Sequence, residues 1–255
     1  MVYLIFILFI SCSHVEQLDF ISKNKPELKL KQYKPYSNQD YVDQLKSFDE
    51  IYLNNLTTTK VPLGKADNEY LYSLVKRITS ANELFFQGKA IPEFNIIESK
   101  TPFHFSLPGH KFFISTGMLK KYVKNESMLY CLLVYELIRS EKNIFEKGII
   151  IPTGAINTRR ILSLLKIKTE DKVEVHKWSF YLLKRIGMES DSYLSWLQIK
   201  NRNSLDFALQ LGDVRSISRE EALFKAFLID NYLDKKSASK YRGSSKRFYK
   251  FIRSI

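Results

Sequence analysis

The segment over residues 126–142, ESMLYCLLVYELIRSEK, carries apolar side chains around most of its circumference. Its leucines recur at helical spacing: Leu129, Leu132, Leu133 and Leu137. A helix that is apolar on nearly all faces belongs in a protein interior. Asn125 can cap its first turn, where Glu126 is also favourable. We therefore predict a mostly buried helix, and the rest of the fold has to be built around it.

Further helices and two short strands are predicted around this segment. The helical ranges are 40–56, 67–81, 156–167, 170–186, 191–201 and 218–233. The runs EFNIIES and HKFFIST are rich in Phe and Ile and predict strands at 93–99 and 110–116. Between them, TPFHFSLPG is interpreted as a connection with a Pro-Gly turn. The pattern indicates an α+β protein in which helices dominate.

Composition sets the size of the domain and the charge of its partners. With 255 residues and 45% hydrophobic content, the chain can build one sizeable core. We place the folded domain at residues 38–233. The net charge of +13 favours anionic partners, and it says nothing about the fold.

The first residues resemble a lipoprotein signal. The run from Val2 to Ile10 is apolar, uncharged and much shorter than the roughly 20 residues of a membrane span. It leads into FISC, which resembles a bacterial lipobox with Cys12 as the lipidated residue. We predict a signal peptide at 1–11, a tether at 12–37, and lipid anchoring in a bacterial cell envelope, at the periplasmic face of the outer membrane. A plain signal peptide, or an apolar leader with an incidental cysteine, is the alternative. Cys131, the other cysteine, is predicted to be a buried and inert thiol.

Several motifs within residues 66–233 occur in one order. The turn FHFSLPGH at 103–110 is followed by TGML at 116–119 and by YELIR at 135–139. EVH at 174–176 comes later, in a helix that ends at Gly187. Together these motifs resemble the gluzincin metallopeptidase family of CAAX prenyl proteases and periplasmic outer-membrane chaperone-proteases. The resemblance implies a mainly helical, zincin-like fold with a small sheet packed beside the active-site helix.

The resemblance breaks at the zinc ligands. In H-E-x-x-H, two histidines four residues apart share a helix face and bind one zinc ion, and the glutamate is the general base. Tyr135 and Arg139 stand at the two histidine positions, whereas Glu136 keeps the general-base position. Glu174 keeps the third-ligand position, and His176 replaces a supporting Asp. This degenerate site implies no metal, no cofactor and an inactive Glu136, with zinc expected only if the pseudoenzyme interpretation is wrong.

The replacements suggest how the site is held together without zinc. Two carboxylates in one cleft repel each other, and a guanidinium offers a planar, permanently charged partner. We expect Arg139 to pair with Glu174 and Tyr135 to fill the remaining volume and donate its hydroxyl to a carboxylate. Alternatively, Glu136 and Arg139 point to solvent and Tyr135 is an ordinary core aromatic. A rebuilt metal site that uses His104 or His110 is a further alternative.

A peptidase groove binds its substrate as an added strand at a sheet edge, and this needs no zinc. We expect that edge at KFFIS, which comprises Lys111, Phe112, Phe113, Ile114 and Ser115. The predicted function is thus a non-catalytic binder of envelope proteins or unfolded polypeptide, acting as a chaperone, adaptor or scaffold. A closed groove is one alternative, and an active metal-dependent endopeptidase with atypical ligands is another.

The end of the chain offers a different kind of function. From Lys235 onward it holds eight basic residues and no acidic one, interleaved with aromatic side chains. We define residues 234–255 as a basic tail. Such a segment can bind anionic lipid headgroups, so the alternative function is that of a membrane-surface binding module. Nucleic acid is not an expected partner of an exported protein.

Overall fold

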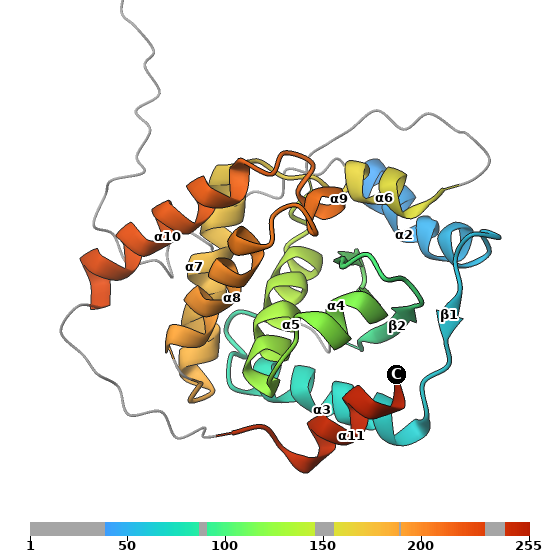
Figure 1. The fold of residues 1–255 in the computed structure, drawn as a ribbon, viewed down its shortest axis with the longest axis horizontal. Coiled ribbons are helices and arrows are strands. Elements are labelled where there is room, and N and C mark those ends of the chain that lie inside the picture. The colour runs from blue at the N-terminus through green and yellow to red at the C-terminus, as the bar shows by residue number, and fades with distance from the viewer. Residues whose placement is uncertain (1–38, 87–90, 146–155, 189, 233–242) are drawn as a thin grey trace, which may run out of the picture. The chain divides into compact units, whose positions relative to one another are not determined.

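Helix α5 (Glu126–Glu141) is the apolar segment that the sequence places in the interior (Figure 1). Asn125 caps it, because its side chain accepts a hydrogen bond from the Met128 amide. Nearly every residue of α5 is buried, including the thiol of Cys131, whose pKa is raised by burial. The predicted burial of this helix and of Cys131 is confirmed, whereas the inertness of the thiol stays a prediction.

The computed structural model describes residues 39–86, 91–145, 156–188, 190–232 and 243–255. The predicted signal peptide at 1–11, Cys12 and the tether at 12–37 lie outside the described residues. No helix in these described ranges is long and apolar enough to cross a membrane.

The other helices surround α5. They are α2 (Gln39–Leu53), α3 (Lys65–Ser80), α4 (Thr116–Lys121), α6 (Thr158–Leu164), α7 (Thr169–Arg185), α8 (Ser190–Arg202), α9 (Ala208–Leu211), α10 (Ser216–Tyr232) and α11 (Lys246–Ser254). Helices α7 and α8 pack along one side of α5 and α10 packs on both of them, whereas α3 lies on another side (Figure 1). The predicted helices agree with these bounds to within three residues, and the α+β class with dominant helices is confirmed.

The sheet has four short strands and mixed pairing. They are β1 (Lys60–Val61), β2 (Glu93–Ile97), β3 (His104–Leu107) and β4 (Lys111–Ser115), in the order β1-β2-β4-β3. Strand β4 is parallel to β2 and antiparallel to β3, and β3 packs beside α5. The sheet therefore lies next to the central helix, with β3 at one edge.

This strand order corrects the predicted groove. Strand β4, which holds Lys111, Phe112, Phe113, Ile114 and Ser115, is paired on both sides and is not an edge. All of these residues except Lys111 are buried. The expectation was wrong because the segment between the two predicted strands is itself strand β3, which covers that side of β4.

Two glycines in the sheet region are required by geometry. Between β3 and β4 the chain turns through Gly109 and His110, with φ angles of 84° and 63°. At the start of α4, Gly117 lies against the main chain of Lys100, where a Cβ atom would sit 2.3 Å from the carbonyl oxygen. A side chain at residue 117 would push these two segments apart.

One face of α2 supplies a large part of the core. Tyr41, Leu45, Phe48 and Tyr52 are buried, as their helical spacing predicts. The ring of Tyr52 meets those of Phe105 and Phe113 edge to face, with centroids 5.6 and 5.5 Å away. Successive side chains of a strand point to opposite faces of the sheet. Helix α2 therefore covers the face of the sheet that is opposite to the face packed against α5.

The described part of the basic tail is folded. Ser245 caps α11, and Phe248 and Phe251 bury their rings, with Phe251 5.7 Å from the ring of Tyr70 in α3. The buried carboxylate of Glu126 accepts hydrogen bonds from the amide and hydroxyl of Ser245. Residues 243–255 thus belong to the domain, and the predicted boundary after residue 233 does not separate them from it.

Replacing Phe251 by Ala tests this docking. We expect the docked state of α11 to lose about 3–5 kcal/mol, because truncation of a buried phenylalanine removes apolar contact and leaves a cavity. Hydrogen exchange of the α11 amides, followed by mass spectrometry, measures the loss. Tyr249→Ala is the matched control, since Tyr249 is 51% exposed. Equal exchange in the two variants would contradict the docked arrangement.

Candidate functional site

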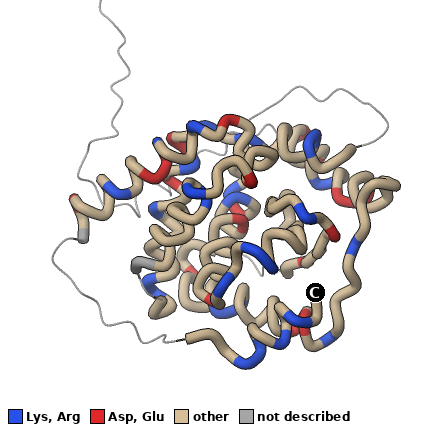
Figure 2. The backbone as a smooth tube through the Cα atoms, viewed as in Figure 1, with Lys and Arg blue, Asp and Glu red and all other residues tan. Residues whose placement is uncertain are grey.

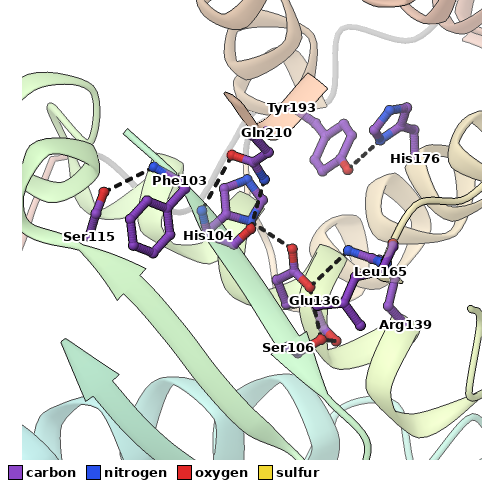
Figure 3. A network of polar contacts seen from close by, with 10 residues as sticks. All are labelled: Phe103, His104, Ser106, Ser115, Glu136, Arg139, Leu165, His176, Tyr193 and Gln210. Carbon is purple, nitrogen blue, oxygen red and sulfur yellow. Dashed lines mark hydrogen bonds and ion pairs between the residues drawn. The ribbon is translucent and has the colours of Figure 1, made fainter. Parts of the chain in front are cut away.

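Glu136 is the centre of a buried polar network (Figure 3). Its carboxylate is 1% exposed and contacts two side chains of β3. His104 Nδ1 lies 2.7 Å from one oxygen, and the hydroxyl of Ser106 donates to the other at 2.8 Å. The alternative in which Glu136 points to solvent is therefore wrong.

The environment keeps Glu136 ionised. Burial alone would raise the pKa of this carboxyl group, but Arg139 and the hydrogen bonds from His104 and Ser106 outweigh burial and lower the pKa from 4.5 to about 2. Burial also lowers the pKa of His104, although Glu136 opposes the shift, so the imidazole is neutral. An ionised carboxylate only accepts hydrogen bonds, so His104 carries its proton on Nδ1 and leaves Nε2 as an acceptor.

Arg139 pairs with Glu136, and the predicted pair with Glu174 is not formed. Its Nη1 lies 3.3 Å from Glu136 Oε2, and its Nη2 donates to the carbonyl oxygen of Leu165. Glu174 instead accepts from Trp178 Nε1 and pairs with Lys177, both on its own helix α7. The expectation was wrong because residue 174 points away from α5, on the other side of α7.

Tyr135 and Arg139 occupy one face of α5, as the i, i+4 spacing predicts. The guanidinium carbon lies 5.6 Å from the centroid of the Tyr135 ring, within the range of a cation–π contact. The Tyr135 ring also stacks on the ring of His176, with the centroids 5.2 Å apart. Burial raises the pKa of Tyr135, and within the described residues its hydroxyl has no hydrogen-bond partner. The aromatic ring fills space as predicted, but the expected bond to a carboxylate is absent there.

His176 brings a second carboxylate to the site. Its Nδ1 lies 2.8 Å from the hydroxyl of Tyr193, and its Nε2 lies 3.4 Å from Glu220 Oε2. Glu220 also pairs with Lys172 at 2.8 Å. Burial is the main cause that lowers the pKa of His176 to about 4, so the ring is neutral near pH 7. The carboxylate from the C-terminal half is therefore Glu220, not Glu174.

A small cavity of about 50 Å³ lies between these two networks. Its walls include His104, Tyr135, Arg139, Lys172, Lys200 and Glu220. Lys200 is 5% exposed, and its ammonium lies 5.9 Å from the ring of Tyr135.

Sequence reasoning missed Lys172, Lys200 and Glu220, although the spacing held a signal. Lys200 continues the buried stripe of Tyr193 and Trp196 along α8. Lys172 precedes His176 by four residues, which places both on one face of α7. Charged residues within an apolar stripe indicate a polar site in the interior. This pattern is the signal in the sequence that would have pointed to the cavity.

The residues present do not fit zinc. Among the described residues, no three His, Cys, Asp or Glu side chains are grouped so that they could hold a metal ion. His104 forms a hydrogen bond with Glu136. His110 Nε2 instead lies 2.8 Å from Glu141 Oε2, and His110 does not line the cavity. Arg139, Lys172 and Lys200 surround the same space with positive charge, which opposes a cation.

The edge strand β3 is held by a side chain from α9. Gln210 Nε2 donates to the carbonyl oxygen of His104 at 2.7 Å, and its Oε1 accepts from the His104 amide at 3.3 Å (Figure 3). A neighbouring strand would use the same donor and acceptor. Gln210 therefore takes up the main-chain hydrogen-bonding groups of His104 that a neighbouring strand would use, and β3 itself is buried.

Comparison of the chain with protein-family models and with curated proteins gives no match. The family resemblance thus depends on the motifs in the sequence.

Replacing Arg139 by Met tests the electrostatic role of the guanidinium. We expect the free energy of unfolding to fall by about 3–5 kcal/mol, because Glu136 is left as a buried charge without its cation. The double variant E136Q/R139M should recover most of this loss, since it buries no charge, its amide oxygen still accepts from His104, and its NH2 group can donate to the Ser106 hydroxyl. Urea denaturation followed by circular dichroism measures both.

The control is Arg219→Met, which breaks the exposed pair with Glu170. Exposed pairs contribute about 1 kcal/mol or less. An R139M loss as small as that of R219M would contradict the role given to Arg139.

Proposed function

We propose that this chain is a non-catalytic relative of the gluzincin metallopeptidases that binds extended polypeptide in a bacterial cell envelope. The zincin-like fold, the lipid anchor at Cys12 and the periplasmic location are parts of this proposal. The main observation that supports the proposal is that Gln210 hydrogen-bonds to the main chain of β3. In the adjacent site, Arg139 neutralises Glu136.

The site favours binding over hydrolysis. A general base has to reach the proton that it removes. Both oxygens of Glu136 are engaged by His104, Ser106 and Arg139, and its low pKa makes it a weak base. Arg139 and Tyr135 fill the face of α5 on which the family places its zinc ligands. The side chains that replace the ligands therefore also disable the base.

The edge of β3 favours an extended partner. Extended peptides add to a sheet edge through main-chain hydrogen bonds. In the antiparallel pair, Phe103, Phe105 and Leu107 bond to β4, so the main chains of His104 and Ser106 face the other side. Gln210 covers the first of these positions. A client that displaced Gln210 would gain the hydrogen bonds that this side chain now makes.

Removing the Gln210 side chain tests the proposal. We expect Gln210→Ala to bind a reduced, carboxymethylated, permanently unfolded protein about 30-fold more tightly, because two competing hydrogen bonds of about 1 kcal/mol each are lost. Fluorescence anisotropy with the labelled unfolded protein measures the affinity. Gln44→Ala, at an exposed position of α2, is the control and should match the wild type.

Two results would count against the proposal. Unchanged affinity in Q210A would remove β3 as the binding edge. About one zinc ion per chain, found by elemental mass spectrometry after dialysis against trace zinc, together with a cleavage activity lost in Glu136→Gln, would favour the active endopeptidase.

A second function is favoured by the orientation of α11. Phe248 and Phe251 are buried, whereas Lys246, Lys250 and Arg253 are exposed. Figure 2 shows that basic positions recur along α11. We propose that this exposed basic side of α11 adsorbs to anionic lipid headgroups. The apolar face of α11 is already used in docking, so the attraction is electrostatic.

Charge removal on α11 tests this second function. We expect Lys246→Gln/Lys250→Gln to weaken binding to phosphatidylserine vesicles about 30-fold, since each cation near such a surface contributes about 1 kcal/mol. Vesicle sedimentation of residues 35–255, the compact unit with all described elements, gives the affinity. Arg219→Gln/Lys225→Gln removes two cations from α10 as the control. Equal binding by both double variants would show that α11 is not the lipid contact.

A further inference from the structure

The cavity between the two polar networks is lined by an excess of positive charge. Arg139, Lys166, Lys172 and Lys200 line it, together with the single carboxylate of Glu220. Two of these cations have carboxylate partners: Arg139 pairs with Glu136, and Lys172 pairs with Glu220. Positive groups around a small, mostly buried space attract an anion strongly, because water screens little there.

Lys200 is the clearest sign of a missing partner. Its side chain is 5% exposed, it lines the cavity, and its ammonium lies against the ring of Tyr135, with the centroid 5.9 Å away. Burial lowers the pKa of Lys200, and the charge of Glu220 only partly opposes this. A buried charge without a partner is costly, so Lys200 gains from an anion beside it.

Two further polar atoms in the cavity walls are unsatisfied. Among the residues described, Arg139 Nε and His104 Nε2 are buried and have no hydrogen-bond partner. The Arg139 atom is a donor. The His104 atom is an acceptor, because Glu136 holds the ring proton on Nδ1. Both atoms belong to residues that line the cavity, so an occupant that reached them would satisfy one donor and one acceptor.

The size of the space limits what can fill it. A water molecule needs about 10–15 Å³ of such space, so about 50 Å³ holds roughly four water-sized groups. A tetrahedral oxyanion has four oxygens. An anion that also forms a hydrogen bond with the acceptor His104 Nε2 has to carry a proton that it can donate.

We propose that this cavity binds one protonated tetrahedral oxyanion, of which hydrogen phosphate is the simplest. Lys200 and Arg139 donate to its charged oxygens, and its hydroxyl group donates to His104 Nε2. Lys172 and Lys166 contribute attraction from the walls. The proposed contacts use neither hydrogen bond of Gln210, although Gln210 and His104 both line the cavity.

Isothermal titration calorimetry of the full-length protein at pH 7 and constant ionic strength tests the proposal. Inorganic phosphate should bind at one site per chain. Sulfate has the same shape but carries no proton at pH 7, and acetate has only two oxygens. Both should bind at least about 10-fold more weakly than phosphate, since a hydrogen bond to a charged or buried group contributes about 1.5–3 kcal/mol.

Two lysine variants separate the cavity from the general charge of the protein. Lys200→Met should weaken phosphate binding at least about 10-fold, and it should not unfold the chain because it replaces a buried charge by an apolar side chain of similar length. Lys177→Met removes a cation from the outer side of α7 and should leave the affinity within about twofold. No saturable heat with phosphate, sulfate binding as tight as phosphate, or an unchanged affinity in K200M would each overturn the proposal.

Discussion

The arrangement of the centre depends on one requirement, which is that a buried carboxylate must have a positive partner. Glu136 lies in the C-terminal half of the central helix, out of reach of bulk water. Arg139 supplies the charge from the next turn, while His104 and Ser106 supply directed hydrogen bonds from β3. Because these partners come from the helix and from the edge strand, the same interaction that satisfies the charge also fixes the sheet against α5.

The local structure could be predicted from the sequence because it depends on short-range patterns. The Asn125 cap and the apolar stripe of α2 both lie where their spacing places them. Strand β3 was missed because it is only four residues long and lies between Pro102 and Pro108 in a segment that also has the signals of a turn. That omission turned the interior strand β4 into an apparent edge.

The partners of the site residues were harder to predict. Pairing Arg139 with Glu174 followed the order of motifs, whereas the structure follows helical faces. Lys172 and His176 share the face of α7 that meets α5, and Glu174 lies about half a turn away. The contact between Gln210 and His104 joins residues 106 positions apart, and no local pattern in the sequence specifies it.

The location of Glu126 has a consequence for how distant helices are coupled. This buried carboxylate lies at the first turns of both α5 and α11, and it accepts hydrogen bonds from Tyr70 in α3 and from Ser245. Release of α11 from the domain would remove two hydrogen bonds from a buried charge and open the N-terminal end of the central helix to water. The docking of a short peripheral helix is thus linked to the stability of the core, so a local opening of residues 243–255 would be transmitted to α5.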